Sequence, residues 1–191
     1  MKTPSQLEKL VPTLRALHSL LVQFEERGMV IGGAAVCLLG EPRMTADVDA
    51  VFLLSNDDLP NLLRAAHEVG FVPRIKDVES FARRNRLVML RHPITNVDVD
   101  ISLGAMPFEI EAVERSRLVR SGKLRVRLPT VEDLIILKAI AHRPKDLVDI
   151  QSLIDANPKL DRARIENWVK QYAELLEMPE LWDDVAKLLE R

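Results

Sequence analysis

Two carboxylates, Asp47 and Asp49, lead directly into the five consecutive apolar residues 50–54. An apolar run of this length is typical of a buried strand, which we place at 48–54. Side chains two residues apart in a strand point to the same side, about 6–7 Å apart along the chain. The chain must therefore fold so that two acidic side chains share one face where a core strand begins.

That arrangement needs a positively charged partner. Two carboxylates on one face repel each other by about 2–3 kcal/mol at an effective dielectric constant of about 20. A divalent cation removes this penalty, and hard oxygen ligands favour Mg²⁺ or Mn²⁺. The alternative is a solvated loop whose acids cap a helix. It fits less well, because Val48 lies between the two acids and a buried strand follows.

A Gly-Gly pair precedes the acidic pair. Gly32 and Gly33 separate a short apolar strand at 29–32 from an apolar helix that extends to about residue 39. Glycines at such a junction let backbone N–H groups approach a phosphate, and the helix N-terminus adds partial positive charge. A tight turn without a ligand is the ordinary alternative. The nearby acids favour the phosphate-binding interpretation.

A second pair of acids lies in the predicted strand 95–103. Alternation places Asp98 and Asp100 on one face of this strand and its apolar residues on the other. If the strand neighbours 48–54, one of the two aspartates completes a cluster for two metal ions. Such a cluster can activate an attacking oxygen with one ion and stabilise a leaving pyrophosphate with the other.

The pattern along the chain changes at Pro129. Before it we expect a helical segment at 5–27 that Gly28 ends, a helix capped by Asn56, and a short helix at 108–115. We also expect strands at 71–75, 80–91 and 95–103, and a hairpin at 118–128 that turns at Ser121-Gly122. Beyond it, Thr130 and Asp133 cap the first of the helices 130–142, 145–156, 161–173 and 179–190. The prediction is an α/β (α+β) protein with a mixed sheet. Its core, with an N-terminal helix, is 1–128, and a helical region, 129–191, follows.

Charge is unevenly distributed. The net charge of −2 does not by itself indicate binding to nucleic acid or membranes. The middle segment, 74–127, is basic, and its charges usually mark the solvated face of strands. The functional alternative is a surface for an anionic co-substrate, such as an RNA end or a triphosphate, on the same side as Asp47 and Asp49. The residues concerned are Arg83, Arg84, Arg86, Arg91, Arg115, Arg117, Arg120, Lys123, Arg125 and Arg127.

Other features exclude several classes of protein. The single cysteine, Cys37, cannot form an internal disulfide, so a reducing cytoplasm is the expected compartment. Charged residues interrupt the first helix, so no signal peptide is expected, and no segment has the ~20 apolar residues that span a bilayer. The four histidines lack metal-ligand spacing, and there is no P-loop or G-x-S-x-G motif.

Together these motifs resemble those of a known superfamily. A strand, Gly-Gly, a helix, Arg43-Met-Thr-Ala-Asp-Val-Asp49 and a later strand with a third aspartate resemble the minimal nucleotidyltransferase fold of the DNA polymerase β superfamily. Downstream, Lys138 on a helix and the stretch Arg143-Pro-Lys-Asp-Leu-Val-Asp149 are similar to the closing motifs of nucleotidyltransferase toxins of type IV toxin–antitoxin systems. The resemblance covers roughly residues 29–155.

The resemblance implies a nucleotide site around the two glycines. Gly32 and Gly33 would cradle the triphosphate, while Arg43 and Thr45 would contact the nucleotide or fix the loop that enters Asp47. A plain structural role is the alternative for both. Many relatives carry Gly-Ser where this chain has Gly33-Ala34, so the backbone must replace the missing hydroxyl.

The resemblance also implies a metal site and its supports. Asp47 and Asp49 would hold Mg²⁺ or Mn²⁺, and Asp100 would be the third carboxylate and base. Asp100 is favoured over Asp98 only for its place in Val-Asp-Ile-Ser. Lys138 would contact the phosphates or order the site, unless it is an ordinary exposed lysine. The supporting residues would be Asp98, Lys145, Asp146 and Asp149, the last two otherwise being surface acids on a first helical turn.

These expectations favour an enzyme. It would move a nucleoside monophosphate from an NTP to an acceptor hydroxyl on RNA, protein or a small molecule, and the resemblance allows a toxin with a cognate antitoxin. The alternatives are a catalytically inactive module that keeps the fold for binding or regulation, and a small structural or oligomerisation protein. Retention of four closely spaced aspartates favours the enzyme, because a degenerate copy gains nothing from acids that repel.

Overall fold

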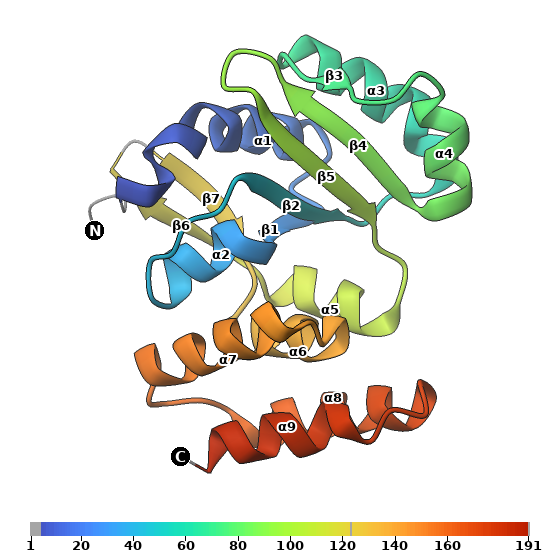
Figure 1. Cartoon of the computed structure of the whole chain (residues 1–191). Coiled ribbons are helices and arrows are strands. Elements are labelled where there is room, and N and C mark those ends of the chain that lie inside the picture. Colours follow the sequence, from blue (N-terminus) through green and yellow to red (C-terminus); the bar gives the residue numbers. More distant parts are fainter. Residues whose placement is uncertain (1–4, 123, 191) are drawn as a thin grey trace.

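A five-stranded mixed sheet lies at the centre of the protein (Figure 1). The computed structural model describes residues 5–122 and 124–190. The strands run in the order β1-β2-β5-β4-β3, with β2 parallel to β5 and the other neighbouring pairs antiparallel. The predicted α/β class with a mixed sheet is therefore confirmed. The strand bounds are β1 Gly28–Ile31, β2 Asp47–Phe52, β3 Val72–Pro73, β4 Leu87–His92 and β5 Val97–Leu103.

A separate antiparallel hairpin follows the sheet, as expected near 118–128. It consists of β6 (Arg117–Ser121) and β7 (Leu124–Leu128), and Gly122 adopts a positive φ of 60° in the turn. In Figure 1 the hairpin lies beside β1 and α1, on the far side of β1 from β4 and β3.

Helices flank the sheet and fill the C-terminal part. In Figure 1, α1, α3 and α4 occupy the upper half and α5–α9 the lower half, while α2 packs against α6 and α7. None of the helices in residues 5–122 and 124–190 combines the length and apolar character that a bilayer crossing requires. The bounds are η1 Ser5–Leu10, α1 Val11–Gln23, α2 Gly32–Leu39, η2 Asn56–Asp58, α3 Leu59–Glu68, α4 Val78–Asn85, α5 Pro107–Arg115, α6 Val131–Ala141, α7 Pro144–Ala156, α8 Arg162–Leu175 and α9 Glu180–Leu189.

The predicted strand at 80–91 is wrong in its first half. Residues 78–85 form α4, whose buried residues Val78 and Ala82 are four positions apart, as on one face of a helix. Arg86 ends this helix in the left-handed conformation, with φ of 52°, and only β4 is extended. The sequence pattern was ambiguous because Arg83 and Arg84 suit the exposed side of a helix as well as a strand.

The expected end of the first helix is also wrong. Helix α1 ends at Gln23, and the chain turns through Glu25 and Glu26, whose φ angles are 57° and 54°. Gly28 instead begins β1, where a Cβ atom would lie 2.5 Å from the carbonyl oxygen of Val51. Glycine at position 28 therefore allows the two strands to pack closely and does not end the helix.

Two of the predicted helix caps differ in detail. Ser55, not Asn56, caps η2: its hydroxyl accepts from the Asp57 N–H at 3.2 Å. Thr130 caps α6 as predicted and accepts from the Asp133 N–H at 3.2 Å. The Asp133 carboxylate does not complete a capping box but accepts a hydrogen bond from Nε of Arg164 at 2.7 Å.

Candidate active site

The four predicted aspartates lie on neighbouring parallel strands. In the β2–β5 register, Asp47 is beside Asp98 and Asp49 is beside Asp100. Alternation along β2 buries Val48 and Ala50 completely and leaves Asp47 exposed and Asp49 partly exposed. Adjacent strands are only about 4.8 Å apart, so the carboxylates gather on one face of the sheet. The condition that the strand at 95–103 neighbours the strand at 48–54 is therefore met.

The glycine pair abuts this acidic face. Gly32 has a positive φ of 64°, and a Cβ atom there would overlap Oδ2 of Asp49. A Cβ atom on Gly33 would lie 2.5 Å from Oγ1 of Thr45. Ile31, the residue before α2, has an apolar side chain and caps none of the first N–H groups of the helix, where Gly32 is partly exposed and Gly33 is buried. The sequence needs glycine at both positions because the side chains of Asp49 and Thr45 come so close.

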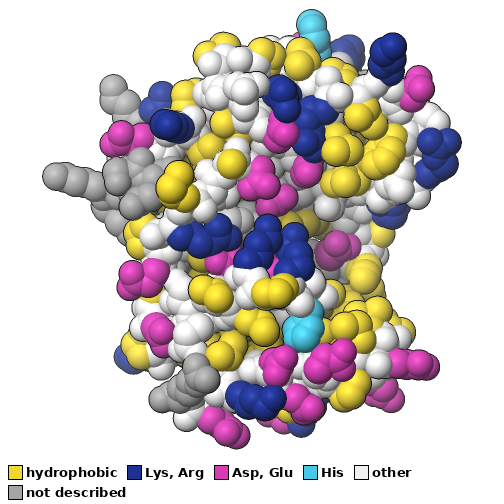
Figure 2. All heavy atoms as spheres, in the orientation of Figure 1, with side chains coloured by type: hydrophobic (Ala, Val, Ile, Leu, Met, Phe, Trp, Pro, Cys, Tyr) yellow, Lys and Arg dark blue, Asp and Glu magenta, His cyan; other side chains and the backbone are white. Residues whose placement is uncertain are grey.

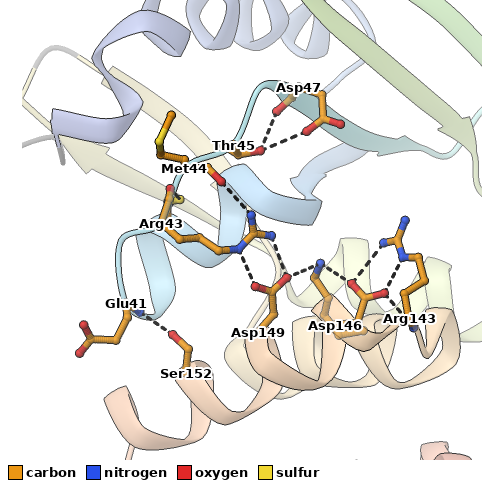
Figure 3. Close-up of polar contacts among 11 residues, drawn as sticks. Glu41, Arg43, Met44, Thr45, Asp47, Arg143, Asp146, Asp149 and Ser152 are labelled. Atoms are coloured by element: carbon orange, nitrogen blue, oxygen red, sulfur yellow. Dashed lines mark hydrogen bonds and ion pairs between the residues drawn. The ribbon is translucent and has the colours of Figure 1, made fainter.

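Thr45 connects the glycine pair to the acids. Its hydroxyl donates to Oδ1 of Asp47 at 3.1 Å (Figure 3). Ala34, which follows the two glycines, is fully buried and has no hydroxyl to offer. Thr45 therefore supplies a hydroxyl beside Gly33, in the loop that enters β2.

Two arginines hold the carboxylates of β5. Arg91 on β4 donates from Nε to Asp98 at 2.6 Å. Arg74, which follows β3, donates from Nη1 to Asp98 at 2.7 Å and from Nη2 to Asp100. Sequence analysis did not single out Arg74, because an isolated arginine after a short strand shows no pattern. Its contacts depend on how β3 and β4 pair.

These arginines separate the two acids of β5 electrostatically. The Arg91 hydrogen bond, with Arg74, lowers the pKa of Asp98. Burial raises the pKa of Asp100. The charge and hydrogen bond of Arg74 act in the opposite direction, but repulsion by Asp98 and Asp47 adds to the effect of burial, and the net shift is upward. The negative charge of Asp98 is therefore balanced by two arginines, whereas the negative charge of Asp100 is only partly balanced.

Asp49 has the least compensated charge of the group. Burial raises its pKa, and repulsion by Asp47 and Asp100 adds to the effect. Among the described residues, ion pairs reach Asp98 and Asp100 but neither Asp47 nor Asp49. The two acids of the group for which the described residues provide no ion pair therefore lie on β2, and Asp49 is the one beside the N-terminus of α2.

A divalent cation fits Asp47 and Asp49 chemically. Both offer hard carboxylate oxygens on one face, and their mutual repulsion is what a cation would remove. Within residues 5–122 and 124–190, however, no three His, Cys, Asp or Glu side chains converge closely enough to hold a metal ion. Asp100, the expected third ligand, instead pairs with Arg74.

A charge network from the helical region supports the loop at 40–46, which leads into Asp47 and is called the acidic loop below. Arg43 donates to both carboxylate oxygens of Asp149, at 2.6 and 2.8 Å (Figure 3). Lys138 pairs with Asp149 and Asp146, each at 2.8 Å, and Arg143 pairs with Asp146 at 2.6 Å. Side chains of α6 and α7 thus hold the loop that leads from α2 to Asp47.

Lys138 is buried and is therefore not the ordinary exposed lysine of the alternative interpretation. Its side chain is only 5 % exposed and lies between two carboxylates, a geometry that favours ordering the site over reaching phosphates. Burial alone would raise the pKa of Asp149, but hydrogen bonds from Arg43 and Lys138 outweigh it and lower the value. The same balance, with Arg143 and Lys138 as donors, lowers the pKa of Asp146. Lys145 lies exposed on the first turn of α7.

The basic segment does not form one surface. Arg91 lies at the acidic site, whereas Arg86 lies at the opposite end of β5 and donates to the Leu103 carbonyl at 2.8 Å. Arg127 on the hairpin pairs with Glu26 at 2.6 Å. Lys123 lies outside the described residues. Figure 2 shows acidic side chains in the middle of one face with basic ones above and below them.

The sheet order, the glycine-initiated helix and the paired carboxylates together define a nucleotidyltransferase fold. Residues 6–180 match the family described as "Nucleotidyltransferase of unknown function (DUF6036)". Because this match spans most of the chain, the protein belongs to that family.

Solved structures agree on the fold. An antigenic nucleotidyltransferase-like protein from Paracoccidioides brasiliensis has 18 % identity and a TM-score of 0.55, over 97 % of this chain and 94 % of that one. The antibiotic-resistance factor ANT(2″)-Ia has 14 % identity and a TM-score of 0.55, over 88 % and 95 % of the two chains. None of the curated proteins matches significantly.

Proposed function

We propose that the protein is a metal-dependent nucleotidyltransferase that moves a nucleoside monophosphate from an NTP to an acceptor hydroxyl. The observation that carries this proposal is the close approach of Asp49, on the acidic face, to the N-terminus of α2, where Gly32 leaves no room for a side chain. One element can bind a triphosphate and the other a cation, and they touch.

In this proposal the triphosphate lies across the backbone of Gly32 and Gly33. Asp47 and Asp49 would hold Mg²⁺ or Mn²⁺, with Asp100 as a third ligand once it is free of Arg74. Bound cations would offset the charge of the triphosphate and favour ionisation of the acceptor hydroxyl. Thr45 and Arg43 hold the loop that carries Asp47, and Lys138, Asp146 and Asp149 hold that loop from the helical region.

The proposed reaction is a displacement at the α-phosphate of the NTP. The acceptor oxygen attacks the α-phosphorus of the NTP, a new O–P bond forms, and the bond to the β-phosphate oxygen breaks to release pyrophosphate. The hydroxyl proton goes to Asp100 or to water.

The test is transfer of label from each α-³²P-labelled NTP in the presence of Mg²⁺ or Mn²⁺. Total RNA, dialysed cell extract and a set of hydroxylated small molecules would be offered separately, so that the labelled product identifies the acceptor class. Transfer to any one of them, abolished in Asp49→Asn, is the expected result. Binding of NTP without transfer to any acceptor would favour the alternative, an inactive module that retains the fold.

The resemblance of Lys138 and the stretch 143–149 to the closing motifs of toxins supports a narrower proposal, that the protein is a toxin neutralised by a cognate antitoxin. The residues that carry the resemblance, Lys138, Asp146 and Asp149, form a buried unit that supports the acidic loop. Induced expression in a bacterial host should then arrest growth, and Asp49→Asn should relieve the arrest. Growth unaffected by the active protein would reject this role and leave the transferase proposal standing.

A further inference from the structure

Arg74 is placed unlike the other cations around the acidic site. It touches both carboxylates of β5, whereas Arg91 touches Asp98 alone. Its side chain is 18 % exposed, compared with 44 % for Arg91. The guanidinium therefore lies partly buried against the face of Asp100 on which a cation would bind.

The Arg74 side chain is held on the acids only by the end of its guanidinium group. The residue lies in an irregular segment between β3 and α4, and its backbone N–H donates to the carbonyl of Met89 at 3.0 Å. Within the described residues its Nε atom is buried without a hydrogen-bond partner. Only the two terminal nitrogens are engaged, one on each carboxylate.

We propose that Arg74 occupies the place of a second divalent cation, and that this cation binds only when the guanidinium leaves Asp100 while remaining on Asp98. This inference rests on the proposed function. It accounts for the absence, among the described residues, of three converging metal ligands although Asp47, Asp49 and Asp100 share one face. The protein without nucleotide then holds one cation more tightly than the second.

In this arrangement Asp98 holds Arg74 while Asp100 is released. A cation that is largely out of water is strongly destabilised when it loses its only partner. Arg74 avoids this destabilisation, because Nη1 keeps its 2.7 Å bond to Asp98 when Nη2 leaves Asp100. Asp98 is thus a positioning residue that retains Arg74, and Asp100 is the carboxylate that changes partner.

Mn²⁺ binding without nucleotide tests the inference, because bound and free Mn²⁺ are distinguished by electron paramagnetic resonance. Arg74→Gln should take up its second Mn²⁺ at an about tenfold lower concentration than the unaltered protein, equivalent to about 1.4 kcal/mol. The matched control is Arg91→Gln. It also removes one positive charge, but from an arginine that contacts Asp98 and not Asp100. It should leave the second Mn²⁺ affinity close to that of the unaltered protein.

A further variant guards against misfolding. Arg74→Lys retains the charge but lacks the planar fork that bridges two carboxylates, so it should bind the second Mn²⁺ with intermediate affinity. Circular dichroism melting in EDTA would confirm that each variant is folded. Equal second-site affinity in the unaltered protein, Arg74→Gln and Arg74→Lys would overturn the inference, as would an equal gain in Arg91→Gln, which would indicate net charge alone.

The same titrations separate this inference from the proposed function. If the unaltered protein binds two Mn²⁺ and transfers nucleotide but Arg74→Gln changes neither affinity, only the role of Arg74 is rejected. If none of the variants binds Mn²⁺ or NTP, the proposed function is rejected and this inference with it.

Discussion

Arg43 and Asp149, separated by 106 positions in the chain, form a two-pronged ion pair with N–O distances of 2.6 and 2.8 Å. The pair joins the loop before β2 to the first turns of α7. Because the Asp149 side chain is only 2 % exposed, the interaction lies mostly out of water. The helical region thereby fixes where the acidic loop can lie.

We expect this pair to be strongly coupled. Arg43→Ala should lower the free energy of unfolding by about 1–3 kcal/mol, less than for a fully buried pair because the arginine is partly exposed. A double-mutant cycle with Asp149→Ala, measured by urea unfolding, should give a coupling energy of about 1–2 kcal/mol. The exposed pair Arg64–Glu68 is the control, with a coupling of about 0.3–0.5 kcal/mol. A coupling no larger than the control would contradict this assignment.

Gly32 should tolerate no side chain. Gly32→Ala forces alanine into a left-handed conformation, which costs about 1–2 kcal/mol, and drives its Cβ into Asp49 as well. Gly70→Ala is the matched control, since it shares the positive φ but its Cβ would meet only His92, at 3.9 Å. Thermal melting should show the larger loss for Gly32→Ala. Equal losses would mean that the contact with Asp49 is soft.

Asp49 should make stability depend on pH in a defined direction. Its raised pKa means that the native state keeps a proton that the unfolded state loses, so its contribution to stability falls as pH rises. The stability advantage of Asp49→Asn over the unaltered protein in EDTA should therefore be small below about pH 3.9, the unfolded value, and should grow above it. Urea unfolding across this range measures the difference. A pH-independent difference would contradict the raised pKa.

Metal and nucleotide should stabilise the protein in sequence. Mg²⁺ or Mn²⁺ should raise the melting temperature, and an NTP should raise it further only when the metal is present. At a hundredfold excess over the dissociation constant, the stabilisation is about 2.7 kcal/mol. No shift with any of the four NTPs at millimolar concentration would favour the inactive alternative.

The acidic face could be predicted from the sequence, whereas its cationic partners could not. Period-two alternation placed Asp47 with Asp49 and Asp98 with Asp100, because strand geometry is local. The contact of Arg74 with these acids depends on the pairing of β3 with β4, which no local pattern encodes. The burial of Lys138 likewise depends on how α7 packs against α6. The α4 segment was mispredicted because exposed arginines suit either conformation.

In the proposed reaction, Asp47 and Asp49 form the centre of nucleotidyl transfer. The most direct measurement compares metal-dependent transfer of label from α-³²P-NTP by the unaltered protein, Asp49→Asn and Asp57→Asn, with an acceptor that the unaltered protein labels. Asp57 is an exposed acid after the far end of β2 and is the control for loss of one negative charge. We predict that Asp49→Asn loses transfer while remaining folded and that Asp57→Asn retains it. Undiminished transfer by folded Asp49→Asn would contradict the account.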